Sequence, residues 1–177
     1  MTRYHPIIVA IHWIVAIMIL MALFIGGPAL VAIDNSDPEK LMPLTGHMVW
    51  GMVIGALMLV RLLVKSKAQN PPAADAGNAM LNLGAKAAHW GLYILVFGMV
   101  GSGLATAFSA DLFAITFGGS GDPLPEDLTK FTARLVHGFI ATLITLLVVA
   151  HVIGWAYHQF VRRDGLIKRM WFGRRKG

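Results

Sequence analysis

The chain has 177 residues, of which 56% are hydrophobic and 14% are charged, and its formal net charge is +6. A soluble domain carries roughly a quarter charged residues, so this composition indicates an integral membrane protein, and the length suits one domain. Cysteine is absent, which excludes disulfides, thiolate metal sites, thiolate nucleophiles and covalent haem attachment through a CxxCH motif.

Four apolar runs are long enough to cross a bilayer core, which needs about 20 residues per helix. They cover about residues 6–28, 43–64, 83–107 and 133–159. The first run is longer than a signal-peptide core of about 7–15 residues, which favours a retained transmembrane helix over a cleaved signal. Residues 112–117 are apolar but too short to span, and we expect them at the membrane interface. We therefore predict an all-α fold, a four-helix transmembrane bundle in which residues 1–177 form a single domain.

The basic residues predict the direction of the helices, because Lys and Arg resist translocation across a membrane. Twelve of the 15 lie at the termini or in and beside the second loop: Arg3, Arg61, Lys65, Lys67, Lys86, Arg162, Arg163, Lys168, Arg169, Arg174, Arg175 and Lys176. Only Lys40, Lys130 and Arg134 fall on the other side, with seven of the nine acids. We therefore predict that both termini are cytoplasmic. The basic C-terminus is interpreted as a topology signal and a contact for membrane lipid headgroups rather than a nucleic-acid site.

Several histidines lie inside the apolar runs. The seven histidines are His5, His12, His47, His89, His137, His151 and His158. Four lie well inside apolar runs, namely His12, His47, His137 and His151, and His89 is in the first turns of the third run. A buried ionisable side chain needs a partner, and inside a membrane it usually marks a functional site. A hydrogen bond to a neighbouring helix would explain one such histidine, but it explains the set less well.

Spacing places three histidines on one side of the fourth span. His137, His151 and His158 are 14 and 7 residues apart, which corresponds to a drift of only about 40° and 20° around a helix. At 1.5 Å per residue, His151 lies about 21 Å deeper than His137. His47 shares the outer depth of His137, and the inner level holds His12, His89 and His151. Two histidine levels are therefore predicted.

Two neutral imidazoles that face one another between helices can supply both axial ligands of a b-type haem. Zinc or non-haem iron would need three or four clustered ligands, and no acidic residue or HExxH motif lies in a span. The glycines beside the histidines, Gly46, Gly51, Gly138 and Gly154, could make room for a porphyrin or could serve close helix packing. Ligation by Met18, Met42 or Met48 is a weaker alternative.

Four motifs together resemble the bacterial cytochrome b561 family of small four-helix di-haem membrane cytochromes. They are YHPIIVAIHW, TGHMVWGMVIGALMLVRLL with the following Pro71-Pro72, AKAAHWGLYILVF, and VHGFIATLITLLVVAHVIGWAYH, and they cover nearly the whole chain. The resemblance implies a multi-pass protein of the bacterial inner membrane with two bis-histidine b haems. It implies that His12 and His151 hold the inner haem and that His47 and His137 hold the outer one, although geometry alone leaves His89 as a rival inner ligand. It matches His89 and His158 to histidines of a cytoplasmic quinone pocket.

The same resemblance implies oxidation of superoxide at the outer surface and reduction of ubiquinone at the inner one. Lys130 and Arg134, just above His137, are the candidates for local attraction of the superoxide anion, or they snorkel at a helix end. The net acidic outer loops disfavour long-range attraction. Trp13, Trp90 and Trp155 could wall the quinone pocket or act as interface aromatics, the second role being favoured for Trp90. The alternative function is an electron-transfer subunit that couples quinone to a separate periplasmic redox enzyme. A non-redox adaptor would require every intramembrane histidine to be structural.

Overall fold

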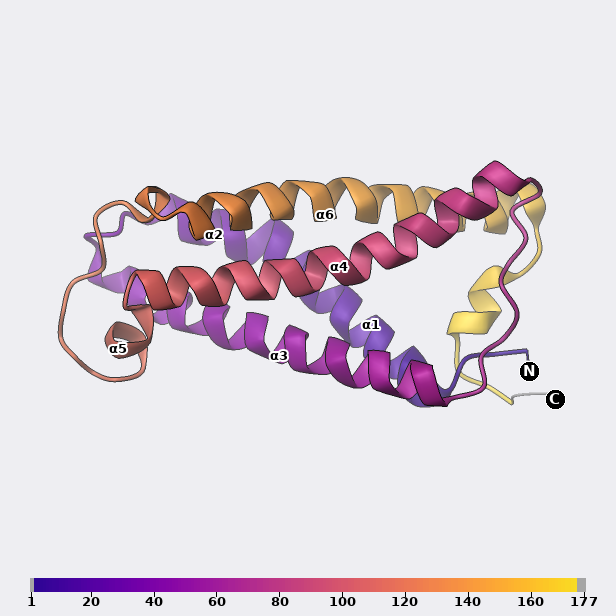
Figure 1. Cartoon of the computed structure of the whole chain (residues 1–177), viewed down its shortest axis with the longest axis horizontal. Helices are drawn as coiled ribbons and strands as arrows, with labels where there is room; N and C mark the ends of the chain where they lie inside the picture. Colours follow the sequence, from indigo (N-terminus) through magenta and orange to yellow (C-terminus); the bar gives the residue numbers. More distant parts are fainter. Residues whose placement is uncertain (1, 175–177) are drawn as a thin grey trace.

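The computed structural model describes residues 2–174, and within that range it is all helical, without a β-strand (Figure 1). The main elements are α1 (Pro6–Met21), a π-helical turn (Ala22–Gly26), α2 (Gly27–Ala32), α3 (Leu41–Lys67), α4 (Ala79–Ser109), α5 (Leu112–Thr116) and α6 (Thr132–Ala156). A second π-helical turn (Tyr157–Arg162) continues α6. Short 3₁₀ turns cover Pro38–Lys40, Leu128–Lys130 and Leu166–Met170. The predicted all-α bundle with four membrane-crossing helices is confirmed.

The four spans are longer than the apolar runs that predicted them. They are Pro6–Ala32, Pro38–Lys67, Ala79–Ser109 and Thr132–Arg162. The predicted limits followed hydropathy, whereas the helix ends are determined by local capping. The Asn78 side chain, for example, accepts a hydrogen bond from the backbone N–H of Leu81, so α4 begins several residues before its apolar run. Asp37 caps the turn that leads into α3 in the same way.

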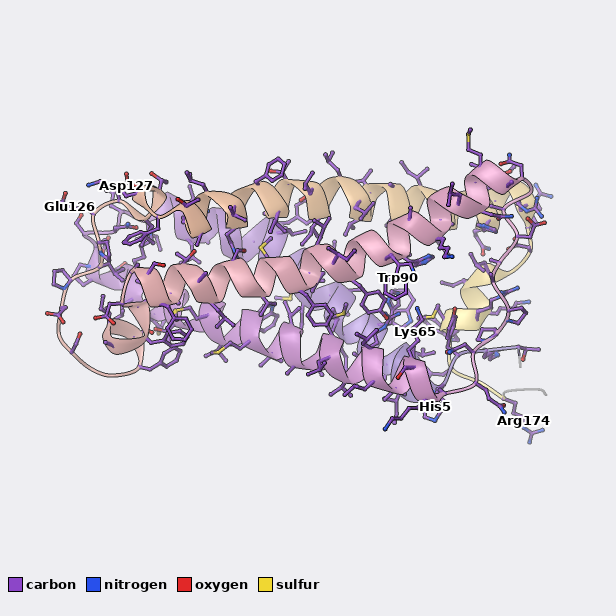
Figure 2. The ribbon with its side chains drawn as sticks, viewed as in Figure 1. His5, Lys65, Trp90, Glu126, Asp127 and Arg174 are labelled. Carbon is purple, nitrogen blue, oxygen red and sulfur yellow. The ribbon has the colours of Figure 1, made fainter. Side chains whose placement is uncertain are left out.

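Both chain ends lie at the same end of the bundle, together with the connection between α3 and α4 (Figure 1). Figure 2 shows the acidic Glu126 and Asp127 at the opposite end from His5 and Arg174. This separation of charge follows the distribution on which the orientation was predicted, and the cytoplasmic side of the termini stays a prediction. Arg175 and Lys176, which were counted with the cytoplasmic bases, lie outside the described residues.

The helices pack as two pairs. α4 packs along α6 and α1 along α3, while α3 also touches α4, but α6 has almost no close backbone contact with α1 or α3. One core cluster joins all four long helices and includes Ile11, Val15, Ile54, Tyr93 and Ile144. Large apolar side chains such as those of Leu146 and Ile153 are exposed, as expected for surfaces that face lipid tails. Between α6 and the α1–α3 pair, the helices therefore meet through side chains of the core cluster rather than through close backbone contact.

The short helix α5 folds back against the outer ends of α3 and α4. Leu112 is buried in a second core cluster with Leu44 and Ala107. The ring of Phe113 lies 4.9 Å from that of Phe108, which is exposed. This segment is too short to span, as the sequence predicted, and it caps the outer end of the bundle.

The C-terminal segment turns back toward the N-terminal end of α1. The chain reverses where Arg163 and Gly165 adopt left-handed backbone conformations, with φ of 52° and 68°. The backbone carbonyl of Met170 then accepts a hydrogen bond of 2.8 Å from Trp13 Nε1, and the carbonyl of Arg169 accepts one of 3.1 Å from Tyr4 N–H. The chain after the fourth span therefore closes the bundle beneath Trp13.

Candidate electron-transfer site

The outer histidines lie opposite one another across the space between the two helix pairs. His47 projects from α3 and His137 from α6, and their ring centroids are 6.0 Å apart with an interplanar angle of 74°. Metal–imidazole bonds of about 2 Å on both sides of one metal ion place two ring centroids about 6 Å apart. The donor atoms and their separation therefore fit bis-histidine ligation of a haem.

The hydrogen bonds of His137 determine which of its ring nitrogens is free. Nδ1 lies 3.1 Å from the backbone carbonyl of Met99 and 3.1 Å from Oγ of Ser102. A carbonyl oxygen can only accept, so Nδ1 carries the proton and Nε2 keeps its lone pair for a metal. Ser102 Oγ in turn donates to the Met99 carbonyl and accepts from Nδ1. Ser102 was not singled out from the sequence, because it lies 35 residues away from His137 on another helix.

If His47 and His137 hold a haem, replacing Ser102 with alanine is expected to raise the reduction potential of that haem and to leave the potential of a haem at the inner histidines unchanged. Acceptors on the distal nitrogen make an imidazole a stronger donor to the iron, which stabilises the oxidised state, and the variant removes one of two acceptors. Spectroelectrochemical titration of the two haems measures the effect. Thr106→Val is the matched control, since it removes a buried hydroxyl one turn away that bonds only the backbone carbonyl of Ser102. An equal change in the control would contradict the role of Ser102.

Three histidines meet at the inner level. The ring centroid of His151 on α6 is 6.4 Å from that of His12 on α1 and 5.2 Å from that of His89 on α4. The longer separation is close to the distance of about 6 Å expected across one metal ion, and the shorter one would require a bent arrangement. Trp13 lies edge-on to His12 at 5.4 Å. Within residues 2–174, no three histidine, cysteine or carboxylate side chains converge in the way a compact metal site needs.

The glycines near the histidines differ in the space around them. A Cβ added at Gly46, Gly51 or Gly154 would meet no other atom within 4 Å, whereas one at Gly55 would lie 3.1 Å from the side chain of Val100. Gly55 thus serves close packing of α3 on α4, and the other three border open space. Open space near histidines that face one another from different helices fits a bulky planar group such as a porphyrin.

The three basic residues predicted on the outer side, Lys40, Lys130 and Arg134, differ in burial and in the groups that their charges reach. Arg134 is half-buried, its Nη1 would lie 3.2 Å from a Cβ at Gly138, and its charge acts on both His47 and His137. Lys130 is exposed and its charge acts on Asp127. Buried Lys40 belongs with Arg134 instead: its Nζ donates to the carbonyl of Ile33 at 2.5 Å, and the two charges repel one another. Of the three cations, Arg134 is therefore the one whose charge reaches the outer histidine pair.

The inner-side candidates fall into two groups. His89 lies against His151, while buried His158 places Nδ1 2.5 Å from Oδ2 of Asp164. Partial burial acts to raise the pKa of Asp164, but hydrogen bonds from His158 and from the Leu166 N–H outweigh it, so this pKa lies below its ordinary value. The carboxylate is therefore ionised throughout the neutral range, and its contribution to stability is lost only as the pH falls through that lowered pKa.

The tryptophans also separate by exposure. Trp90 is 55% exposed and Trp155 37% exposed on the bundle surface, whereas Trp13 is half-buried and its indole N–H is already bonded to Met170. The position of Trp90 fits an interface aromatic. Of the three, Trp13 is the one that the structure places beside an inner histidine.

Four helices are long and apolar enough to cross a membrane, and histidines on different helices face one another in pairs, a combination that fits a multi-pass membrane protein with a redox cofactor. Residues 3–173 match the family model described as prokaryotic cytochrome b561. The chain belongs to this family of membrane electron-transfer proteins, and the family implies haem b as cofactor. It is 22% identical over 173 residues to "Probable superoxide oxidase CybB" of Yersinia pestis, covering 95% of each chain. It is 28% identical over 173 residues to "Cytochrome b561 homolog 2" of Escherichia coli (strain K12), covering 95% of this chain and 90% of the relative.

Proposed function

We propose that the protein oxidises superoxide at its outer surface and passes the electrons to ubiquinone at its cytoplasmic side, in the bacterial inner membrane. Two superoxide anions yield two dioxygen molecules and two electrons, and ubiquinone takes up these electrons with two protons to form ubiquinol. Haem b at each histidine level would supply the one-electron redox chemistry that connects the two surfaces. The arrangement that carries the proposal is the two facing histidine pairs, His47 with His137 and His12 with His151, both anchored on α6.

On the outer side, the proposal assigns the attraction of the anion to Arg134 and Lys130. Arg134 lies over Gly138, next to His137, where a small anion would have to approach. Lys130 is exposed one turn earlier and is partly offset by Asp127. Local positive charge in a partly buried position raises the concentration of an anionic substrate even where the wider surface is acidic. The name of the Yersinia pestis relative supports the same substrate.

On the inner side, His89 and His158 are proposed to bind a quinone carbonyl and to deliver protons. Histidine can do both near neutral pH. The carboxylate of Asp164 fixes the Nδ1 side of His158 and leaves its Nε2 for a ligand. Trp13, held by Met170 beneath the bundle, is proposed as one wall of this pocket.

The alternative is an electron-transfer subunit for a periplasmic redox enzyme, and the charge of the outer loops favours it. Seven of the nine acidic residues lie on the outer side, which suits a basic protein partner better than an approaching anion. The same histidines would serve both functions. The two functions differ in whether the isolated chain reacts rapidly with superoxide.

Stopped-flow mixing of the purified protein with superoxide tests the proposal, with haem and ubiquinone reduction followed by absorbance. Arg134→Gln is expected to lower the second-order rate of reduction about tenfold at low ionic strength, because it removes the half-buried positive charge beside His137. Lys130→Gln should have a smaller effect, since Lys130 is exposed. Reduction that is slow in the unaltered protein and accelerates only when a periplasmic partner is added would favour the alternative.

A further inference from the structure

Two cations near the inner end of α3 have no acidic partner among residues 2–174. Arg61 and Lys65 are one helical turn apart and both half-buried, and both lie over the ring of Tyr93 on α4, at 5.3 and 5.2 Å from its centroid. Figure 2 shows Lys65 between α3 and α4. Among the described residues the ion pairs are those of Asp164 with His158 and with Arg162. Two like charges held this close in a membrane span are costly unless an anion compensates them.

The hydrogen bonds of Arg61 show that part of its guanidinium is unused. Nη1 donates to the hydroxyl of Tyr93, whereas Nε is fully buried and has no hydrogen-bond partner. A buried donor of a charged group without an acceptor is unfavourable, and a planar guanidinium is well suited to carboxylates. The unpaired donor therefore indicates an anionic ligand that is not part of the chain.

The location of this unpaired charge points to the interior of the bundle rather than to lipid. Tyr93 is buried in the main core cluster with Ile11 and Val15 of α1. Arg61 lies six residues before the end of α3, which is about 9 Å along the helix axis. The Arg61 charge acts on each of the three inner histidines.

We propose that Arg61, Lys65 and Tyr93 form an anion site that receives the two propionate carboxylates of a haem b held by the inner histidines. Two carboxylates match two cations, and the Tyr93 hydroxyl can donate to one of them while it accepts from Arg61. This assignment rests on haem binding at the inner level and is independent of whether superoxide or a protein partner supplies the electrons.

Redox titration of the purified two-haem protein tests the anion site through a quantity other than turnover. In Arg61→Gln the reduction potential of the inner haem is expected to fall while that of the outer haem stays constant, because loss of a nearby positive charge stabilises the oxidised iron. Lys65→Gln should shift it in the same direction, and Arg61→Lys should stay close to the unaltered protein. Loss of only the inner haem in Arg61→Gln, with retention in Arg61→Lys, would also support the site.

Lys67→Gln is the matched control, because it removes one exposed positive charge from the end of the same helix. Equal shifts in the control, equal shifts of both haems, or no shift in Arg61→Gln and Lys65→Gln would overturn the proposal. If Arg61→Gln loses both haems, Lys65→Gln tests the proposal instead. A lower potential of the inner haem in Lys65→Gln would support the anion site, and an unchanged or higher one would overturn it.

A lipid phosphate is the other source of the same chemistry, and vesicle composition separates the two. The protein is reconstituted into phosphatidylcholine with or without phosphatidylglycerol. If propionates occupy the site, the Arg61→Gln shift is the same in both membranes, and a shift that appears only with the anionic lipid would overturn the proposal. Two bound haems with unchanged potentials in the variants would reject the anion site without testing the superoxide reaction. Shifted potentials in a protein that does not react with superoxide would support the anion site and reject the proposed superoxide oxidation.

Discussion

Replacing His137 with alanine is expected to leave the protein with one haem instead of two. His137 faces His47 with a centroid separation of 6.0 Å, and its Nδ1 is held by Met99 and Ser102 so that Nε2 is free to bind iron. If His137 and His47 hold the outer haem, the variant removes both one bond to it and the ring orientation that the hydrogen bonds of His137 provide. The haem-to-protein ratio, measured by pyridine haemochromogen absorbance, should therefore fall by half.

Because His47 and His137 are proposed to hold the same haem, variants of both residues test the outer site more strictly than one variant alone. His47→Ala should lose the same haem, and the double variant should lose no more than either single one, because both side chains serve one cofactor. Val136→Ala, next to His137 on the exposed side of α6, is the matched control and should keep two haems. Survival of both haems in His137→Ala would show that the outer pairing is wrong.

At the inner level, His151→Ala and His12→Ala are each expected to lose the inner haem, and His89→Ala is expected to keep it. The reason is geometric: the 6.4 Å separation of His12 and His151 suits two ligands of one iron better than the 5.2 Å between His89 and His151. If His89 donates a proton to the quinone, as proposed, His89→Ala should slow ubiquinone reduction by about 100-fold while both haems stay bound.

Haem content and quinone-reduction rate, measured on the same preparations, separate the two roles of His89. Retention of the inner haem in His12→Ala together with its loss in His89→Ala would make His89 the ligand. Trp90→Phe, one residue along and exposed, is the control for local disturbance of α4. It should change neither the haem content nor the rate.

The sequence predicted the helical class, the four spans and the depth of each histidine, because hydropathy and a rise of 1.5 Å per residue depend only on local order. Beyond the histidine pairs, it could not predict which side chains of other helices become neighbours. The contacts of Ser102 with His137 and of Arg61 with Tyr93 depend on the packing of α4 against α6 and α3, which the sequence does not specify locally. Asp164 lies beyond the fourth span in sequence, and the reversal after Arg163 brings it back to His158.

The helix limits were also predicted only in part, and every predicted span was too short. Each structural span extends past its apolar run, by up to five residues at one end. The additional turns are polar or capped, as at Asn78, so hydropathy does not record them. The incorrect helix limits do not change the predicted distance between the two histidine levels, because the histidines lie inside the apolar runs.

The separation of α6 from α1 and α3 has a consequence for how the protein is made. Backbone packing joins α1 to α3 and α4 to α6, and α3 also touches α4, whereas α6 meets α1 and α3 mainly through side chains, among them the histidine pairs. A ligand that binds side chains on both sides of this contact stabilises the closed arrangement by the free energy of its binding. Haem supply would then act as a late step of assembly, so cells short of haem should accumulate an inserted but loosely closed chain that is more readily degraded by membrane proteases.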